Sequence, residues 1–263
     1  MGDRTTIEWT DATWNPMTGC TKVSEGCANC YALTVAERKT RDVYLRQIPV
    51  KDTVANRGDP FAPRFWEERL EVPLHWRRPR RVFVNSMSDV FHAHFSREMI
   101  QRVFAVMNRA HWHQFQVLTK RPERALRIAD ELEWGEHIWL GTSIENMDVA
   151  HRADALRATP AAVKFISAEP ILGPLDALDL KGIDWVIGGG ESGHGFRPCD
   201  PAWARGLRDL CVREKIAFFW KQWGGLTPKS GGRMLDGRSW NEYPVDLPFT
   251  LQGGTDIVAV APG

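Results

Sequence analysis

The chain has 263 residues, of which 43% are hydrophobic and 25% are charged, and its formal net charge is +1. This length supports one large hydrophobic core or two small ones, and we expect a single domain over residues 1–263. No apolar stretch is long enough to cross a bilayer, and the first residues lack the basic-then-apolar order of a signal peptide, so we expect a cytoplasmic protein with no membrane partner. The near-neutral charge excludes a global attraction to nucleic acid and leaves only local basic patches for such binding.

Three of the five cysteines, Cys20, Cys27 and Cys30, fall within one short segment. An odd cysteine count without a secretion signal argues against a disulfide framework, and reduced thiols are free to bind a metal. A structural zinc site takes four protein ligands, whereas an iron–sulfur cubane can take three thiolates and leave one iron open. The remaining cysteines, Cys199 and Cys211, lie far downstream and outside any metal-ligand motif. The clustered thiols therefore predict a shared metal, and the missing fourth ligand is typical of an open cluster.

We call residues 19–31, which contain the three clustered thiols, the cysteine loop. After this loop, short apolar runs alternate with stretches of helical periodicity, as in repeated βα units. We expect seven strands, at residues 5–9, 81–85, 116–119, 137–141, 163–167, 184–188 and 216–220. Helices are expected at 96–110, 123–132, 147–157 and 201–214, with Ser96 as the N-cap of the first. The alternation predicts an α/β fold in which six to seven parallel strands form a partial or nearly closed, TIM-barrel-like (βα) barrel, and an open doubly wound sheet is the alternative.

Two segments do not fit the alternation of strands and helices. Residues 41–80 form an insertion rich in charge, and residues 224–263 form an extension rich in glycine and proline. We expect both to be loop-like lids or surface wraps.

Polar residues follow nearly every predicted strand. In a parallel βα barrel the strand ends converge on one face, where catalytic groups sit. As a set these residues predict a functional pocket, and the candidates for catalysis are Lys120, Glu145, Glu169, Glu191 and Lys221. Thr119 and Ser143 are candidates for cofactor binding, as are Gly189 and Gly190, whose missing side chains let a ligand approach the backbone closely. The alternatives are strands that simply leave the core at polar positions and, for the glycines, a tight barrel turn.

The segment from Asn15 to Cys20, the three thiols and the run Cys30-Tyr31-Ala32 resemble the cluster loop of the radical S-adenosylmethionine superfamily. In this chain six residues instead of three separate the first two cysteines, and Asn29 stands where that superfamily has an aromatic residue. The longer loop also resembles a phage-associated family with a three-cysteine motif, which is similar to the spore photoproduct lyase branch of that superfamily.

The resemblance implies a [4Fe–4S] cluster on Cys20, Cys27 and Cys30 whose open iron binds S-adenosylmethionine. It also implies an electron donor protein, cleavage to a 5′-deoxyadenosyl radical, and abstraction of hydrogen from a substrate. For that substrate we expect a nucleobase or nucleoside, alone or in nucleic acid. By position in the topology, the resemblance implies that the cofactor's amino group is held after the second strand by Ser86, Ser88 and Asp89.

Other residues leave alternatives open. Lys120 and Arg121 can grip a carboxylate or phosphate, and the basic run from His75 to Arg81, with an indole at Trp76, suits a phosphate backbone and a stacked base. The alternative for both is a solvated, charged surface. The competing function is a zinc-stabilised nucleic-acid-binding protein without catalysis, with His194 or Cys199 as fourth ligand.

Overall fold

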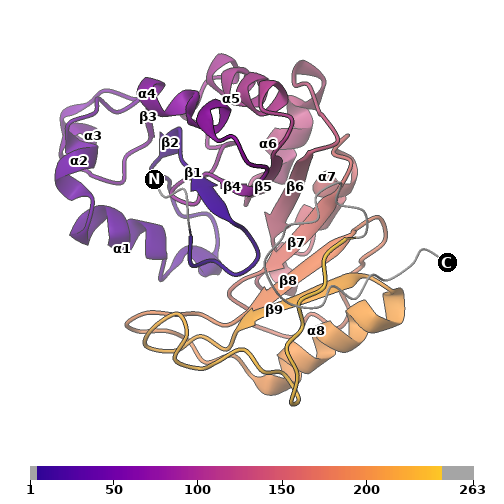
Figure 1. The fold of residues 1–263 in the computed structure, drawn as a ribbon. Helices are drawn as coiled ribbons and strands as arrows, with labels where there is room; N and C mark the ends of the chain where they lie inside the picture. Colours follow the sequence, from indigo (N-terminus) through magenta and orange to yellow (C-terminus); the bar gives the residue numbers. More distant parts are fainter. Residues whose placement is uncertain (1–4, 245–263) are drawn as a thin grey trace.

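The computed structural model describes residues 5–244. Seven parallel strands form one curled sheet, a half-barrel with strand order β1-β4-β5-β6-β7-β8-β9 (Figure 1). The strands span Ala12–Trp14 (β1), Arg81–Val84 (β4), Gln114–Thr119 (β5), Ile138–Ser143 (β6), Lys164–Ala168 (β7), Trp185–Gly189 (β8) and Ala217–Gln222 (β9). The predicted partial barrel is confirmed. The predicted first strand at residues 5–9 is wrong, because these residues form turns and the first strand of the sheet is β1, which pairs with β4.

Helices connect most of the strands, as is typical of a βα fold, whereas β7 and β8 are joined by residues 169–184 without a helix. They span Arg97–Arg109 (α5), Pro122–Arg127 (α6), Arg152–Arg157 (α7) and Pro201–Glu214 (α8), with short 3-10 turns at Ala129–Glu131 (η3) and Met147–Val149 (η4). The predicted cap of α5 is confirmed, because the Ser96 hydroxyl accepts a hydrogen bond from the backbone N–H of Met99 at 3.2 Å. Asp200 caps α8 in the same way through the N–H of Ala202 at 2.8 Å.

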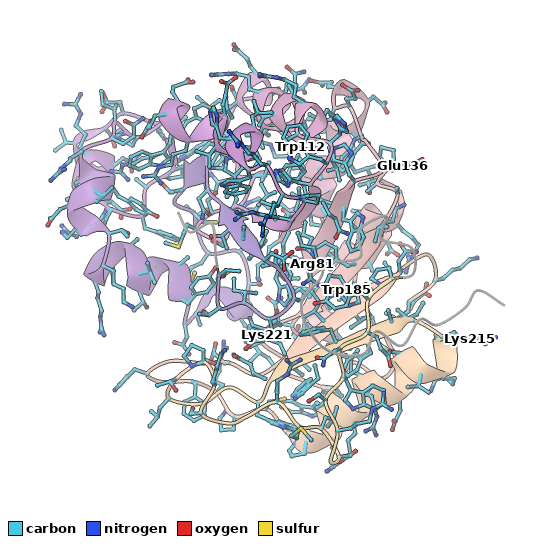
Figure 2. All side chains as sticks on the ribbon, in the orientation of Figure 1. Arg81, Trp112, Glu136, Trp185, Lys215 and Lys221 are labelled. Atoms are coloured by element: carbon cyan, nitrogen blue, oxygen red, sulfur yellow. The ribbon has the colours of Figure 1, made fainter. Side chains whose placement is uncertain are left out.

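Side chains alternate between the two faces of the curled sheet, as the period of a strand dictates. On the outer face, Val82, Val117 and Leu140 pack with the apolar faces of α5 to α8 in one large core. On the inner face, a second core gathers aromatic side chains around Trp185, the first residue of β8, which is the strand next to the β9 edge of the sheet (Figure 2). Ring centroids lie 5.6 Å from Trp185 for Phe165 and 6.1 Å for Trp139. These aromatic residues fill the concave side on the amino half of the strands.

The N-terminal third of the chain lies to one side of the sheet (Figure 1). It contains Met17–Thr18 (β2), Glu25–Cys27 (η1), Tyr31–Arg38 (α1), Arg41–Leu45 (α2), Val54–Gly58 (α3), Arg64–Phe65 (β3), Glu67–Leu70 (α4) and Val72–His75 (η2), and β2 pairs with β3. Segment 41–80 is therefore not the loop-like lid we expected. The fully buried guanidinium of Arg64 holds it together, because it donates to the carbonyl oxygens of Gln47, Ala62 and Asn56.

In the C-terminal segment, residues 224–244 follow turns and isolated bridges, and the remainder of the predicted extension lies outside the described residues. Within residues 5–244, no helix has the length and apolar character needed to cross a membrane.

Candidate functional site

The cysteine loop begins directly after β2 and lies at the carboxyl ends of the sheet strands. Gly19, with a φ of +85°, donates its N–H to the carbonyl of Met87 at 2.9 Å and bridges to Ser88. A Cβ at this position would lie 2.4 Å from the carbonyl oxygen of Ala62, so both the φ and the space require glycine. The N–H of Cys20 then donates to Phe61 at 3.1 Å. These contacts fix the first thiol beside the segment that follows β4.

All three clustered cysteines are free thiols of intermediate burial. Cys27 ends η1, and Cys30 is the N-cap residue of α1. Burial raises the pKa of Cys20 to about 11, with the negative charge of Asp89 as the next cause. Three uncrosslinked thiols on one loop fit the donor chemistry of an iron–sulfur cluster. Within residues 5–244 no three metal-binding side chains are gathered around one point, so a metal shared by the three thiols would require them to turn toward each other.

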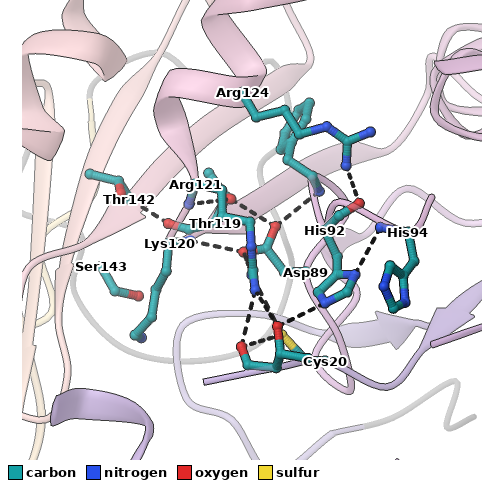
Figure 3. A network of polar contacts seen from close by, with 12 residues as sticks. Cys20, Asp89, His92, His94, Thr119, Lys120, Arg121, Arg124, Thr142 and Ser143 are labelled. Carbon is teal, nitrogen blue, oxygen red and sulfur yellow. Dashed lines mark hydrogen bonds and ion pairs between the residues drawn. The ribbon is translucent and has the colours of Figure 1, made fainter. Parts of the chain in front are cut away.

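Asp89 and Arg121 connect the cysteine loop to β5 (Figure 3). The Arg121 guanidinium donates through Nη1 to Asp89 Oδ2 at 2.8 Å and to Cys20 Sγ at 3.5 Å. Its Nη2 donates to the carbonyl of Thr21 at 3.0 Å and to the Thr21 hydroxyl at 3.2 Å. Asp89 is 5% exposed and also accepts from the Thr119 hydroxyl at 2.7 Å and from the N–H of Lys120 at 3.0 Å. The pair therefore ties the first thiol to the end of the neighbouring strand.

His92 contacts the same turn and is neutral. Its Nδ1 accepts from the N–H of His94 at 3.1 Å, so Nε2 carries the proton and donates to the Thr21 hydroxyl at 2.9 Å. Burial, aided by the charge of Arg121, lowers the pKa of His92 to about 4.

The middle of the cysteine loop contacts Glu145. Oε1 of Glu145 accepts from the N–H of Gly26 at 3.2 Å, and Oε2 forms a buried ion pair with Arg152 Nη1 at 3.1 Å. A Cβ at Gly26 would lie 2.8 Å from the Glu145 carboxyl, so the loop backbone reaches the carboxylate only because residue 26 is glycine. Glu145 thus positions the loop in this structure.

The end of the loop contacts Glu191, which follows β8. The Asn29 amide donates to Glu191 Oε2 at 2.9 Å and to the carbonyl of Gly195 at 2.9 Å. Arg197 pairs with Glu191 Oε1 at 2.6 Å and donates to the carbonyl of Glu25 at 3.1 Å. Hydrogen bonds from Arg197 and Asn29 outweigh the effect of burial and lower the pKa of Glu191. The carboxylate of Glu191 is therefore ionised and engaged in holding the two loops together.

The inner face carries a separate group of polar side chains at the carboxyl end of the sheet. Lys221 Nζ lies 2.9 Å from Glu169 Oε1, and the Ser167 hydroxyl donates to Glu169 Oε2 at 3.3 Å. Figure 2 shows Lys221 at the end of β9 that faces the cysteine loop. Ser143 pairs in register with Ser167, and Lys120 extends β5 beside Ser143, with its side chain directed away from the Asp89–Arg121 pair (Figure 3). Among the described residues Lys120 Nζ has no partner, so it is available to an anion.

The other predicted cofactor contacts take part in local packing. The Ser86 hydroxyl bonds to the side chain of Asn15, while the Ser88 hydroxyl is buried and without a protein partner in the described chain. Gly189 lies against Glu169, since a Cβ there would lie 2.9 Å from Oε1, and a Cβ at Gly190 would lie 2.1 Å from the Trp223 carbonyl. Close approach between strand ends thus explains both glycines. Whether these residues contact a cofactor stays a prediction.

Sequence reasoning missed four residues that hold the cysteine loop. They are Asn15, Gly26, Arg152 and Arg197. Asn15, Gly26 and Arg197 act through partners distant in the sequence, and Arg152 acts through Glu145, seven residues away. The sequence pattern does not assign these contacts. The basic run from His75 to Arg81, for which nucleic-acid contact and a solvated surface were the two alternatives, lies at the amino edge of the sheet, opposite the loop. Its last residue, Arg81, begins β4 and pairs with Asp11 at 2.9 Å.

A family model described as "Protein of unknown function (DUF5131)" matches residues 4–244. The chain belongs to this family. A search of curated proteins found no match to the DUF5131 chain. Among solved structures, "Spore photoproduct lyase complexed with dinucleoside spore photoproduct" is similar over 80% of the DUF5131 chain, with 13% identity and a TM-score of 0.49. The DUF5131 chain covers 65% of the length of that chain.

Proposed function

We propose that this DUF5131 protein is a radical S-adenosylmethionine enzyme whose [4Fe–4S] cluster is held by Cys20, Cys27 and Cys30. When bound, such a cluster supplies the electron that cleaves the sulfonium of S-adenosylmethionine and generates a 5′-deoxyadenosyl radical. The fold supports the proposal because parallel strand ends converge on one edge of a half-barrel, where catalytic groups of such folds sit.

One observation carries the proposal: the loop with all three clustered thiols is tied to that edge at its start, middle and end. Arg121 holds the start, Glu145 the middle and Glu191 the end. These three residues follow β5, β6 and β8, so the loop spans much of the curled sheet.

The polar side chains on the inner face of the sheet can bind an anionic group and hold or move a proton. Lys120 offers an ammonium to the carboxylate of S-adenosylmethionine or to a phosphate of the substrate, and Ser143 lies beside it. The side chains of the Lys221–Glu169 pair are 22% and 15% exposed, so this pair can hold or move a proton where water is largely excluded. The aromatic core below closes the site from the amino side.

The proposal extends to a nucleobase or nucleoside as substrate and to a separate protein as electron donor. The first part rests on the resemblance of the cysteine loop to the photoproduct lyase branch. The second follows from electron balance, because reductive cleavage consumes one electron that the described residues do not provide.

Metal analysis of the anaerobically purified protein tests the metal site. We expect about four irons with matching acid-labile sulfide per chain, and a loss of most of this iron on replacing Cys20, Cys27 or Cys30 by serine. Cys199→Ser is the matched control and should retain its iron. Stoichiometric zinc without iron would favour the nucleic-acid-binding alternative.

A further inference from the structure

The Arg121 side chain lies between the first thiol and a buried carboxylate. It makes two contacts to Thr21, one to Cys20 Sγ and one to Asp89, all within 3.5 Å. The side chains of Arg121 and Asp89 are 15% and 7% exposed, so solvent screens these contacts only weakly. Arg121 directly precedes α6, whose first residue is Pro122. Its backbone is anchored as well, because its N–H donates to the Thr119 hydroxyl at 2.9 Å.

We propose that Arg121 is a positioning residue that fixes Cys20 and Thr21, and that the Asp89–Arg121 pair sets the reduction potential of the cluster that Cys20 holds. The second part rests on the proposed function, whereas the first part concerns the chain alone.

The sign of the effect on the potential follows from charge. Reduction adds a negative charge to a cluster, so an N–H donor and a positive charge beside a ligand sulfur stabilise the reduced form and raise the potential. Arg121 supplies both at Cys20, and Asp89 partly cancels the charge while orienting the guanidinium. Removing the arginine should therefore lower the potential, and neutralising the aspartate should raise it.

Arg124 provides a matched control on the same segment. Its guanidinium donates to the carbonyl oxygens of His92 and Phe95. Among the residues described, it has no hydrogen bond to Cys20, Thr21 or the rest of the cysteine loop. Arg124→Gln thus removes an equally sized cation and its backbone contacts without removing any direct hydrogen bond to the cysteine loop.

Hydrogen exchange on the iron-free full chain tests the positioning role. We expect the amides of residues 20–22 to exchange at least about tenfold faster in Arg121→Gln than in wild type, because charged hydrogen bonds to the turn are lost. Arg124→Gln should leave these amides unchanged. Arg121→Lys keeps the charge without the forked geometry and should lie between the two. Equal exchange in wild type and Arg121→Gln would overturn the positioning role even if the protein binds no iron.

Redox titration of the iron-loaded protein tests the second part. The potential should fall in Arg121→Gln, rise in Asp89→Asn, return toward wild type in the double variant and change less in Arg124→Gln than in Arg121→Gln. A purely structural role predicts shifts of the same sign in both single variants, so that result, or no shift, would overturn the electrostatic role. A wild-type protein that binds no iron refutes the proposed function and with it this second part, while the exchange result still decides the first.

Discussion

Gly26 and Glu145 touch across 119 residues of sequence, through a hydrogen bond of 3.2 Å from the glycine N–H to Oε1. A methyl group at residue 26 would lie 2.8 Å from the Glu145 carboxyl, closer than any side chain tolerates. Glu145 is fully buried and paired with Arg152, so the carboxylate cannot easily move away. The path of the cysteine loop therefore depends on the glycine at position 26, which has no Cβ.

Gly26→Ala should displace the loop and reduce iron loading several-fold, because the methyl group and the carboxylate cannot occupy the same space. Iron and sulfide analysis after anaerobic reconstitution measures the effect. Gly58→Ala is the control, since a Cβ at Gly58 meets no atom within 4 Å, and it should load iron like wild type. Full loading of Gly26→Ala would show that the contact with Glu145 does not define the loop.

Glu145→Ala should destabilise the iron-free protein by about 3 kcal/mol, because it leaves the Arg152 charge buried without its carboxylate. Urea unfolding measures the change in the free energy of unfolding. Glu123→Ala removes an exposed carboxylate that lies 3.8 Å from His151, and it should cost less than about 1 kcal/mol. Similar costs for the two variants would contradict the importance assigned to the buried pair.

Stability should fall as the pH drops from about 6.5 toward 4, in part because of His92. Burial and Arg121 lower the pKa of the folded-state imidazole to about 4, so over this range only the unfolded chain takes up the proton. The contribution of His92 to the free energy of unfolding is fully present at pH values above the pKa of the unfolded-state imidazole. It amounts to at most about 3 kcal/mol.

Urea unfolding of wild type and His92→Gln at several pH values checks this. The variant should lose less stability between pH 7 and pH 5, and a residual slope should remain because burial also lowers the pKa of His113 and His137. Identical slopes for the two proteins would contradict the neutral, buried assignment of His92.

Arg197→Ala should loosen the contact between the cysteine loop and the segment after β8. The change removes the ion pair with Glu191 and the hydrogen bond to the Glu25 carbonyl. Limited proteolysis should then cut within residues 190–199 several-fold faster. The free energy of unfolding in urea should fall less than in Glu145→Ala, because Glu191 keeps its hydrogen bonds from the Asn29 amide and from the backbone N–H of residue 197. Arg213→Ala, which breaks an exposed pair with Glu214, should leave the cleavage rate unchanged.

Strands β4 to β9 could be predicted because each is a compact apolar run, and the observed boundaries differ from the expected ones by at most two residues. The first strand could not, because Ala12–Trp14 is short and polar at its centre, whereas the run ending in Trp9 looks equally extended. Trp9 is buried instead in the inner aromatic core, 4.7 Å from Phe83.

Only part of the candidate site could be predicted from the sequence. The clustered thiols and the polar residues at the strand ends are local patterns, so they could be recognised. Thr119 lies two residues after Val117 in β5, so the strand period also predicts that its side chain points to the outer face of the sheet. The contacts that hold the loop are not local: Arg121 reaches Cys20 over 101 residues and Asn29 reaches Glu191 over 162. Such pairings emerge only once the sheet curls and brings the strand ends together.

The most direct test of the central claim is the product formed from S-adenosylmethionine by the anaerobically reconstituted, chemically reduced protein. The account predicts 5′-deoxyadenosine and methionine in equal amounts from the wild type, and neither from Cys20→Ser, Cys27→Ser or Cys30→Ser. Iron-loaded, reduced protein that leaves S-adenosylmethionine intact would contradict it.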